Sequence, residues 1–165
     1  MSRIVVSEFV TLDGVMEDPG GAEGFEHGGW AFQFERGPEG DQFKLDEVMA
    51  ADALLLGRRT YEGFAEAWPS RTGEFADKFN TMPKYVVSTT LENPEWSNTT
   101  VFSGDLAAEV RHDLIDEYRL MVFPVVLGTG KRLFTEGADR FPLQVVDLRQ
   151  TGEVVILTLR RGQEE

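Results

Sequence analysis

The segment that most constrains the fold is Leu54–Glu62, which reads Leu-Leu-Leu-Gly-Arg-Arg-Thr-Tyr-Glu. It starts as an apolar run, stops at Gly57, and continues after two arginines into a helical pattern. Such a pattern predicts a short buried strand over residues 53–56, of the kind found in sheets covered on both faces. The strand leads directly into a helix, so the segment favours an α/β architecture.

The rest of the chain extends this pattern of strands and helices. Helices are predicted for residues 43–51, 60–67, 74–80 and 103–114. In the first of them, Asp41 is a candidate N-cap and Phe43, Val48 and Met49 are candidate inward residues. Strands are predicted for residues 4–10, 53–56, 84–88, 99–102, 117–126, 143–148 and 154–159. The order predicts an α/β fold in one domain, 1–165, with a mostly parallel sheet, flanking helices and a C-terminal antiparallel hairpin around Thr151-Gly152.

Composition excludes several classes of function. The 165-residue chain has 29 acidic against 16 basic residues, a net charge of −13, which argues against nucleic-acid or anionic-membrane partners. It has no cysteine, and two histidines, His27 and His112, are too few to favour a metal site. Neither a signal peptide nor a membrane-spanning run is apparent, so we expect a cytoplasmic protein that binds a small molecule.

Two groups of polar residues follow short apolar strands. They are Gly57, Arg58, Arg59 and Thr60 in one place, and Ser88 and Thr89 in the other. If the two strands are parallel neighbours, both groups lie at one edge, where guanidinium and hydroxyl groups suit phosphate oxygens. The alternative is ordinary helix capping with two solvated arginines.

Two loop segments are further candidates for ligand contacts. Gly14 allows close approach of a ligand to the backbone, while the neighbouring Asp13 either holds a substrate amine or shapes a turn. Glu26 and His27 precede Trp30, which is either a residue beside a heteroaromatic ligand or a core residue. Gly128-Thr129-Gly130-Lys131 lacks the spacing of an ATP-binding loop, and no nucleotide fingerprint or hydrolase triad is present.

Four blocks together resemble the RibD C-terminal-domain-like branch of the dihydrofolate reductase superfamily. The blocks are Val5–Met16, Ala53–Glu62, Pro83–Ser88 and Asp116–Phe134. The resemblance implies NADPH-dependent reduction of a pteridine-like or pyrimidine-like heterocycle, as in riboflavin biosynthesis or folate reduction. It singles out no catalytic side chain, because the cofactor supplies the hydride and the protein positions the two rings.

The resemblance also implies roles for individual residues. Cofactor phosphates would meet Gly57, Arg58, Arg59 and Thr60, and the adenine-ribose end would meet Ser88 and Thr89. The nicotinamide would lie against Gly14 and Val15. The substrate would be bordered by Trp30 and the Pro124–Gly128 segment, with Asp13 and Glu26 as candidate polar contacts.

One departure from the family pattern is large. The family has a strand, a glycine turn and a further helix where Val110-Arg111 runs directly into His112 in this chain. In the superfamily that strand is central and lies beside the first strand, and the turn contacts the cofactor pyrophosphate. Because the loss of a central strand leaves backbone groups to be paired, we expect a homodimer. The alternative function is a non-catalytic binding or interaction protein that has lost the cofactor.

Overall fold

The computed structural model describes residues 2–103 and 114–162. Its helices are the 3-10 helix η1 (Trp30–Gln33), α1 (Gly37–Ala50), α2 (Arg58–Ala67) and α3 (Glu74–Thr81). Its strands are β1 (Val5–Thr11), β2 (Leu54–Gly57), β3 (Lys84–Val87), β4 (Thr99–Phe102), β5 (Glu117–Phe123), β6 (Leu143–Thr151) and β7 (Val154–Arg161). The chain divides into two compact units, residues 1–41 with 112–165 and residues 42–111. The predicted helix over 103–114 lies almost wholly outside the described residues.

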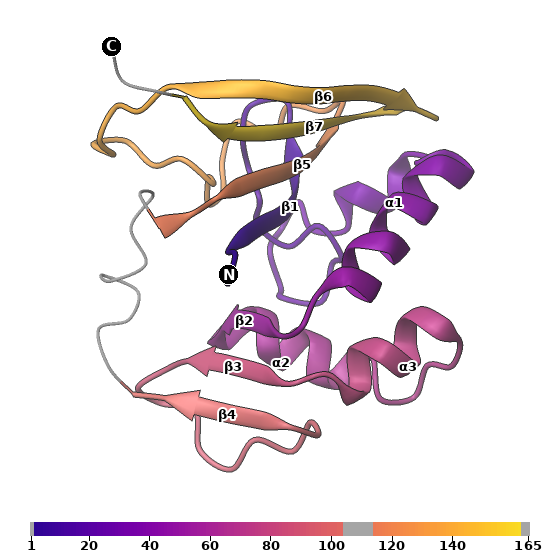
Figure 1. Cartoon of the computed structure of the whole chain (residues 1–165), viewed down its shortest axis with the longest axis vertical. Coiled ribbons are helices and arrows are strands. Elements are labelled where there is room, and N and C mark those ends of the chain that lie inside the picture. The colour runs from indigo at the N-terminus through magenta and orange to yellow at the C-terminus, as the bar shows by residue number, and fades with distance from the viewer. Residues whose placement is uncertain (1, 104–113, 163–165) are drawn as a thin grey trace. The chain divides into compact units, whose positions relative to one another are not determined.

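The first unit is built on a four-stranded sheet in the order β1-β5-β7-β6 (Figure 1). β1 runs parallel to β5, with Val5 opposite Glu117 and Thr11 opposite Phe123. β5 and β6 both pair antiparallel with β7, so the predicted C-terminal hairpin is confirmed. Its turn requires Gly152, because φ is +55° there and a Cβ atom would collide with the carbonyl oxygen of Glu35.

Both faces of this sheet carry apolar side chains. On one face Tyr118 and Leu120 of β5 pack in a cluster with Val10, Ile115 and Leu159. On the other face the ring of Phe123 makes edge contacts with three aromatic rings, those of Phe9, Trp30 and Phe34. The central strand β5 is therefore the best-buried part of the first unit.

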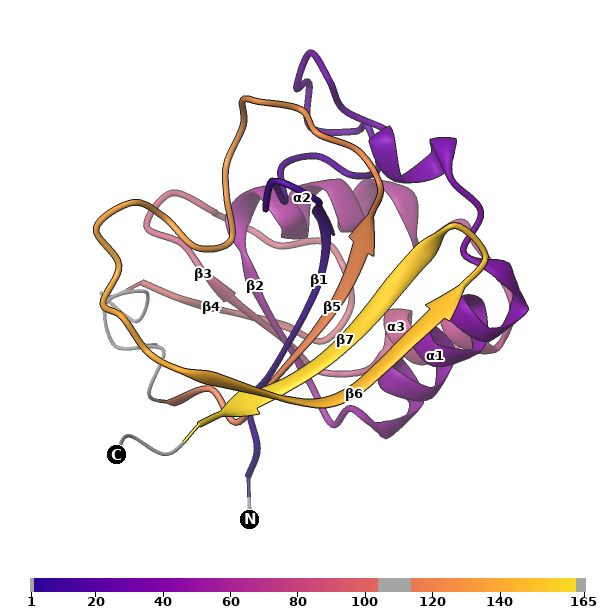
Figure 2. The same ribbon diagram turned by 90° about the horizontal axis from the view of Figure 1, so that it is seen from above.

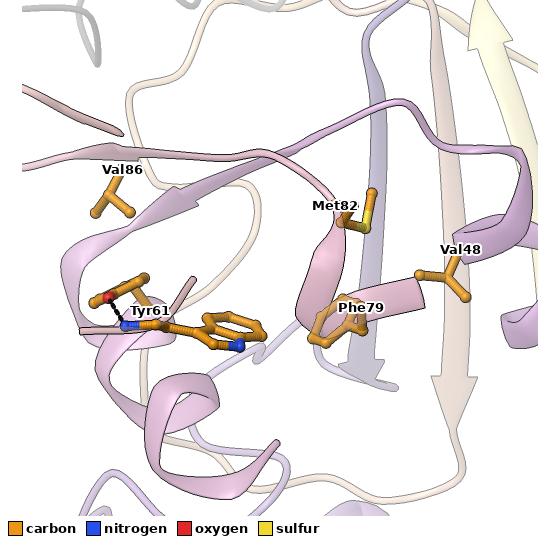
Figure 3. Close-up of a cluster of buried hydrophobic side chains, with 6 residues drawn as sticks. Val48, Tyr61, Phe79, Met82 and Val86 are labelled. Atoms are coloured by element: carbon orange, nitrogen blue, oxygen red, sulfur yellow. Dashed lines mark hydrogen bonds between the residues drawn. The ribbon is translucent and has the colours of Figure 1, made fainter. Parts of the chain in front are cut away.

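The second unit contains a three-stranded parallel sheet, β2-β3-β4, against which α2 packs. Its core cluster is formed by Val48, Tyr61, Phe79, Met82, Val86 and Trp96 (Figure 3). The Tyr61 hydroxyl accepts a hydrogen bond of 3.1 Å from the backbone N–H of Trp96. That bond fixes the loop before β4 to helix α2.

The predicted fold class is confirmed, with parallel strands, flanking helices and an antiparallel hairpin. The described strands form two sheets, in which β1 is the end strand of one and β2 the end strand of the other.

Several local predictions are wrong. Residues 53–56 do not form a strand buried on both faces, since Leu55 is 46% exposed and shares an exposed face with Tyr85. Met49 is exposed rather than inward, whereas Val48 is buried as expected. Asp41 does not cap a helix, because α1 begins four residues earlier at Gly37. The Gly37-Pro38 pair was the signal for this earlier start, since proline favours the first helical turn.

Candidate functional site

The first unit contains a cavity of about 480 Å³ beside β1 and the start of α1. Its lining residues are Phe9, Ala31, Phe32, Phe34, Glu35, Arg36, Gly37, Pro38 and Asp41. A volume of this size suits a small organic ligand. The cavity therefore defines the candidate substrate site.

The chain reversal beside this cavity is held by β6. Gly37 has a φ of +69°, a conformation that suits glycine and lets the chain turn into α1. The hydroxyl of Thr151 donates to the carbonyl oxygen of Arg36 at 2.6 Å and accepts from the N–H of Gly40 at 3.1 Å. These bonds fix the first turn of α1, and with it the positions of Arg36 and Asp41.

In the cavity, the oppositely charged Arg36 and Asp41 form an ion pair beside the aromatic ring of Phe9. Nη2 of Arg36 lies 2.8 Å from Oδ1 of Asp41, and the Arg36 guanidinium lies 5.5 Å from the ring centroid of Phe9. The Asp41 side chain is 65% exposed, so its carboxylate remains accessible to a ligand. A carboxylate accepts N–H donors and a guanidinium donates to carbonyl or anionic oxygens, so the pair suits an amino-substituted heterocycle.

Asp13 lies outside this cavity and is engaged with the backbone. Its carboxylate accepts hydrogen bonds from the N–H groups of Gly128 at 2.8 Å and Leu127 at 3.3 Å. The Thr11 hydroxyl donates to Oδ1 at 2.5 Å and is the main cause of the lowered pKa of Asp13, which the two backbone bonds also lower. This geometry favours the alternative in which Asp13 shapes the chain. It joins the end of β1 to the loop after β5.

The predicted nicotinamide contacts lie next to Asp13. Gly14 has a φ of +82°, and in the part of the chain that the structure describes no atom beyond its chain neighbours lies within 4 Å of the position of a Cβ, so its Cα is open on that side. Val15 is fully buried, and its N–H bonds to the Thr11 hydroxyl at 2.9 Å. A ring at this position would therefore meet the backbone around Gly14 rather than the Val15 side chain.

The other predicted substrate residues do not line the cavity. Trp30 is only 1% exposed and its Nε1 donates to the Glu17 carbonyl oxygen at 2.9 Å, so it is a core residue. Glu26 lies 3.3 Å from the His27 imidazole, with 73% of its side chain exposed. Pro124 is exposed in the loop after β5, where the Gly128 N–H contacts Asp13.

In the second unit, the predicted phosphate-binding residues do come together. β2 and β3 are parallel neighbours, with Gly57 opposite Val87, so Gly57–Thr60 and Ser88–Thr89 follow the same edge of the sheet. Helix α2 begins directly after Gly57, without a side-chain cap. Apart from the adjoining chain, no atom of the described residues lies within 4 Å of the position that a Cβ on Gly57 would occupy. The edge thus offers open space at a helix N-terminus.

The side chains at this edge differ in how they are engaged. Arg58 bonds both carboxylate oxygens of Glu62, at 3.1 and 3.0 Å. Arg59 is exposed, and it makes no ion pair or hydrogen bond within residues 2–103 and 114–162. The hydroxyl of Ser88 accepts bonds from the N–H groups of Thr90 and Leu91, so it shapes the turn after β3. Arg59 is therefore the side chain here that is best placed for an anion.

The described residues contain neither a metal-binding cluster nor a membrane-spanning helix. No group of three or more histidine, aspartate or glutamate side chains there is arranged to hold a metal ion. No helix in that part of the chain has the length and hydropathy needed to cross a membrane.

The sequence matches a model of one protein family, described as the RibD C-terminal domain, over residues 2–110 and 103–157. The two matched segments overlap at 103–110, next to the expected gap. The chain is also 26% identical to the uncharacterized protein YyaP of Bacillus subtilis, over 184 positions covering 93% of this chain and 92% of YyaP. Because 184 positions exceed the 165 residues of this chain, YyaP has residues without a counterpart here.

Solved structures share the fold. A putative riboflavin biosynthesis protein from Shewanella sp. PV-4 superposes with a TM-score of 0.71 at 20% identity, covering 98% of this chain and 100% of that one. Dihydrofolate reductase from Enterococcus faecalis, solved with NADP(H), gives a TM-score of 0.55 at 13% identity, with coverage of 98% and 97%. At these identities the likeness concerns the fold alone.

Proposed function

The chain belongs to the RibD C-terminal domain family, and on that premise we propose that it is an NADPH-dependent reductase of a small pteridine-like or pyrimidine-like heterocycle. The expected substrate is a riboflavin-pathway aminopyrimidine or a folate. The cofactor, when bound, supplies the hydride. The chain's own residues hold the two rings and exclude water. The proposal includes a cytoplasmic location, in keeping with a chain that has no cysteine.

The proposed substrate class is supported mainly by the Arg36–Asp41 ion pair in the cavity. A flat ring can pack along Phe9 and Phe34, while ring amino groups donate to the Asp41 carboxylate. A bidentate arrangement of this kind gives direction as well as affinity. Arg36 is then available for an oxygen substituent on the same ring.

The cofactor half is supported by the edge that follows β2 and β3. The N-terminus of α2 offers a partial positive charge and the exposed Arg59 offers a full one. The open space at Gly57 leaves room for phosphate oxygens. In a chain with a net charge of −13, a positively charged edge is a selective place for an anion. The donor set fits the phosphates of a nucleotide.

Replacing Arg59 by alanine is expected to weaken NADPH binding more than NADH binding, by about 1.5–3 kcal/mol, as for a hydrogen bond to a charged group. The reason is that only NADPH carries the 2′-phosphate. Isothermal titration with both nucleotides measures the difference. Arg58→Ala is expected to act in the same direction, with part of its effect arising from the lost contact to Glu62.

Arg140→Ala, at an exposed arginine of the other unit, is the matched control and should leave both affinities unchanged. An equal loss of NADPH and NADH affinity in Arg59→Ala would contradict the 2′-phosphate assignment.

The family segment that is missing between Val110 and His112 favours a second candidate function. The two family matches overlap at 103–110, and the chain runs from there directly into His112. The family's glycine turn, which contacts the cofactor pyrophosphate, has no counterpart in the sequence. A chain that kept the cavity and lost the cofactor would be a ligand-binding or interaction protein, and it would bind heterocycles with no response to NADPH.

A further inference from the structure

The charges that line the cavity of the first unit are unbalanced. Among the described residues that line it, Glu35 and Asp41 are acidic and Arg36 is the one basic residue. Nη2 of Arg36 lies 2.8 Å from Oδ1 of Asp41, so the positive charge is already paired with one of the two carboxylates. Within residues 2–103 and 114–162, Glu35 has no basic partner that would neutralise the other carboxylate.

A further carboxylate is held next to Glu35 by the turn between β6 and β7. Figure 2 shows this turn beside the chain that enters α1. Oε2 of Glu153 accepts a hydrogen bond of 2.9 Å from the N–H of Glu35, and the N–H of Glu153 donates to the carbonyl oxygen of Glu35 at 2.7 Å. The two reciprocal bonds fix the backbone at Glu35, so the two acidic residues are anchored side by side.

The carboxylates of Glu35, Asp41 and Glu153 outnumber the single guanidinium of Arg36 at this place. The chain as a whole has a net charge of −13, so its remaining charges do not favour an anion there either. Repulsion from fixed negative charges raises the free energy of an anionic ligand in the cavity, and it reaches furthest at low ionic strength. A neutral or cationic ligand does not meet this cost.

The aromatic residues of the cavity select in the same direction. Phe9, Phe32 and Phe34 line it, and Phe32 is 76% exposed, so its ring is accessible to a ligand. The face of an aromatic ring is the negative part of its quadrupole and attracts cations and N–H donors. The Arg36 guanidinium, 5.5 Å from the ring centroid of Phe9, already makes this kind of contact. The cavity is therefore better suited to a flat ring with amino groups than to a group with anionic oxygens.

We propose that the cavity accepts an amino-substituted heterocycle without a phosphate group, and that Glu35 and Glu153 determine this specificity by repelling phosphate-bearing analogues. The inference rests on the proposed function and narrows its substrate class. A phosphate group could gain the Arg36 charge only in competition with Asp41, and it would still lie among the other carboxylates. The amino groups of an uncharged heterocycle leave the Arg36–Asp41 ion pair in place.

Cytidine and cytidine 5′-monophosphate test the specificity as a matched pair of probes, because they share an aminopyrimidine ring and differ by one phosphate group. In calorimetric titrations of the whole chain at low ionic strength, cytidine is expected to bind about tenfold more tightly, and added salt should reduce the difference. Glu35→Gln and Glu153→Gln each remove one negative charge at nearly constant size. Each should reduce the ratio of the two affinities roughly threefold, by strengthening the binding of the monophosphate. Glutamine at position 153 can still accept the N–H of Glu35.

Glu136→Gln is the matched control, since it makes the same charge change at an exposed glutamate of the same unit that does not line the cavity. It should leave both affinities unchanged, and circular dichroism checks that each variant is folded. A wild type that binds the monophosphate as tightly as cytidine would overturn the inference and leave the cavity as a heterocycle site. An unchanged ratio in both folded variants would likewise overturn the roles of Glu35 and Glu153. If neither cytidine nor 2-aminopyrimidine bound, the proposed function would fail together with the inference.

Discussion

Replacing Lys84 by methionine is expected to lower the free energy of unfolding by about 2–4 kcal/mol, because buried carbonyl groups lose their donor. Lys84 is 0% exposed, and its Nζ donates to the carbonyl oxygens of Asn80, Met82 and Ser97 at 2.9, 2.9 and 3.0 Å. The ammonium group also lies 4.3 Å from the ring centroid of Trp96. Lys84 thus joins the end of α3 to the loop before β4.

Methionine matches the length of the lysine stem but donates no hydrogen bond, so the carbonyl partners stay buried and unpaired. Urea denaturation of the two proteins measures the difference. Lys131→Met, at an exposed lysine, is the control and should change stability by no more than about 0.5 kcal/mol. If Lys84→Met also changed the free energy of unfolding by no more than about 0.5 kcal/mol, the hydrogen bonds of the Lys84 ammonium group would contribute nothing to stability.

Lys84 also makes the free energy of unfolding depend on pH. Burial lowers the pKa of Lys84 in the folded protein. Between the folded and unfolded pKa values the unfolded chain binds more protons, so stability from this group rises as pH increases through that window. Lys84→Met should lack this rise. Parallel pH–stability curves for the wild type and Lys84→Met above neutral pH would contradict the lowered pKa.

Replacing Asp41 by asparagine is expected to weaken the binding of a 2-aminopyrimidine probe by about 1.5–3 kcal/mol, as for the loss of a charged hydrogen bond. Asparagine keeps the shape of the side chain but offers an amide in place of the carboxylate that accepts the ring's N–H groups. Under the proposed function, the Michaelis constant for the heterocycle rises, while the affinity for NADPH is unchanged. Calorimetric titration with the probe and with NADPH separates the two effects.

Asp46→Asn is the matched control, because Asp46 is an exposed aspartate of the same helix that does not line the cavity. It should leave binding of the probe unchanged. Equal affinity of the wild type and Asp41→Asn for the aminopyrimidine would remove Asp41 from the site and leave the cavity without its principal acceptor.

Much of the fold could be predicted from local pattern. The apolar run 53–56, the alternation in 143–159 and the Thr151-Gly152 turn each indicated the element that forms, because side-chain periodicity reports burial directly. The exposed face of Leu55 and Tyr85 could not be predicted in this way. A short apolar run shows that a strand forms, but burial on its second face depends on what packs there.

The candidate site was predictable in part for the same reason. The edge with Gly57 and Ser88 followed from strand ends and parallel pairing, which are local features. Arg36 and Asp41 were missed because their meeting depends on the turn at Gly37 and on the bond to Thr151, which lies over a hundred residues away. Asp13 and Trp30 were identified as candidates, but their contacts to Gly128 and Glu17 are structural.

The measurement that tests the proposed reductase most directly is a titration of the protein with NADPH, followed by tryptophan quenching and energy transfer to the reduced nicotinamide. Trp68 and Trp96 lie in the unit that carries the Gly57–Thr60 edge, so they are suitable reporters. We expect saturable binding that is tighter for NADPH than for NADH. No binding at millimolar NADPH would contradict it and favour a protein that retains the fold without the cofactor.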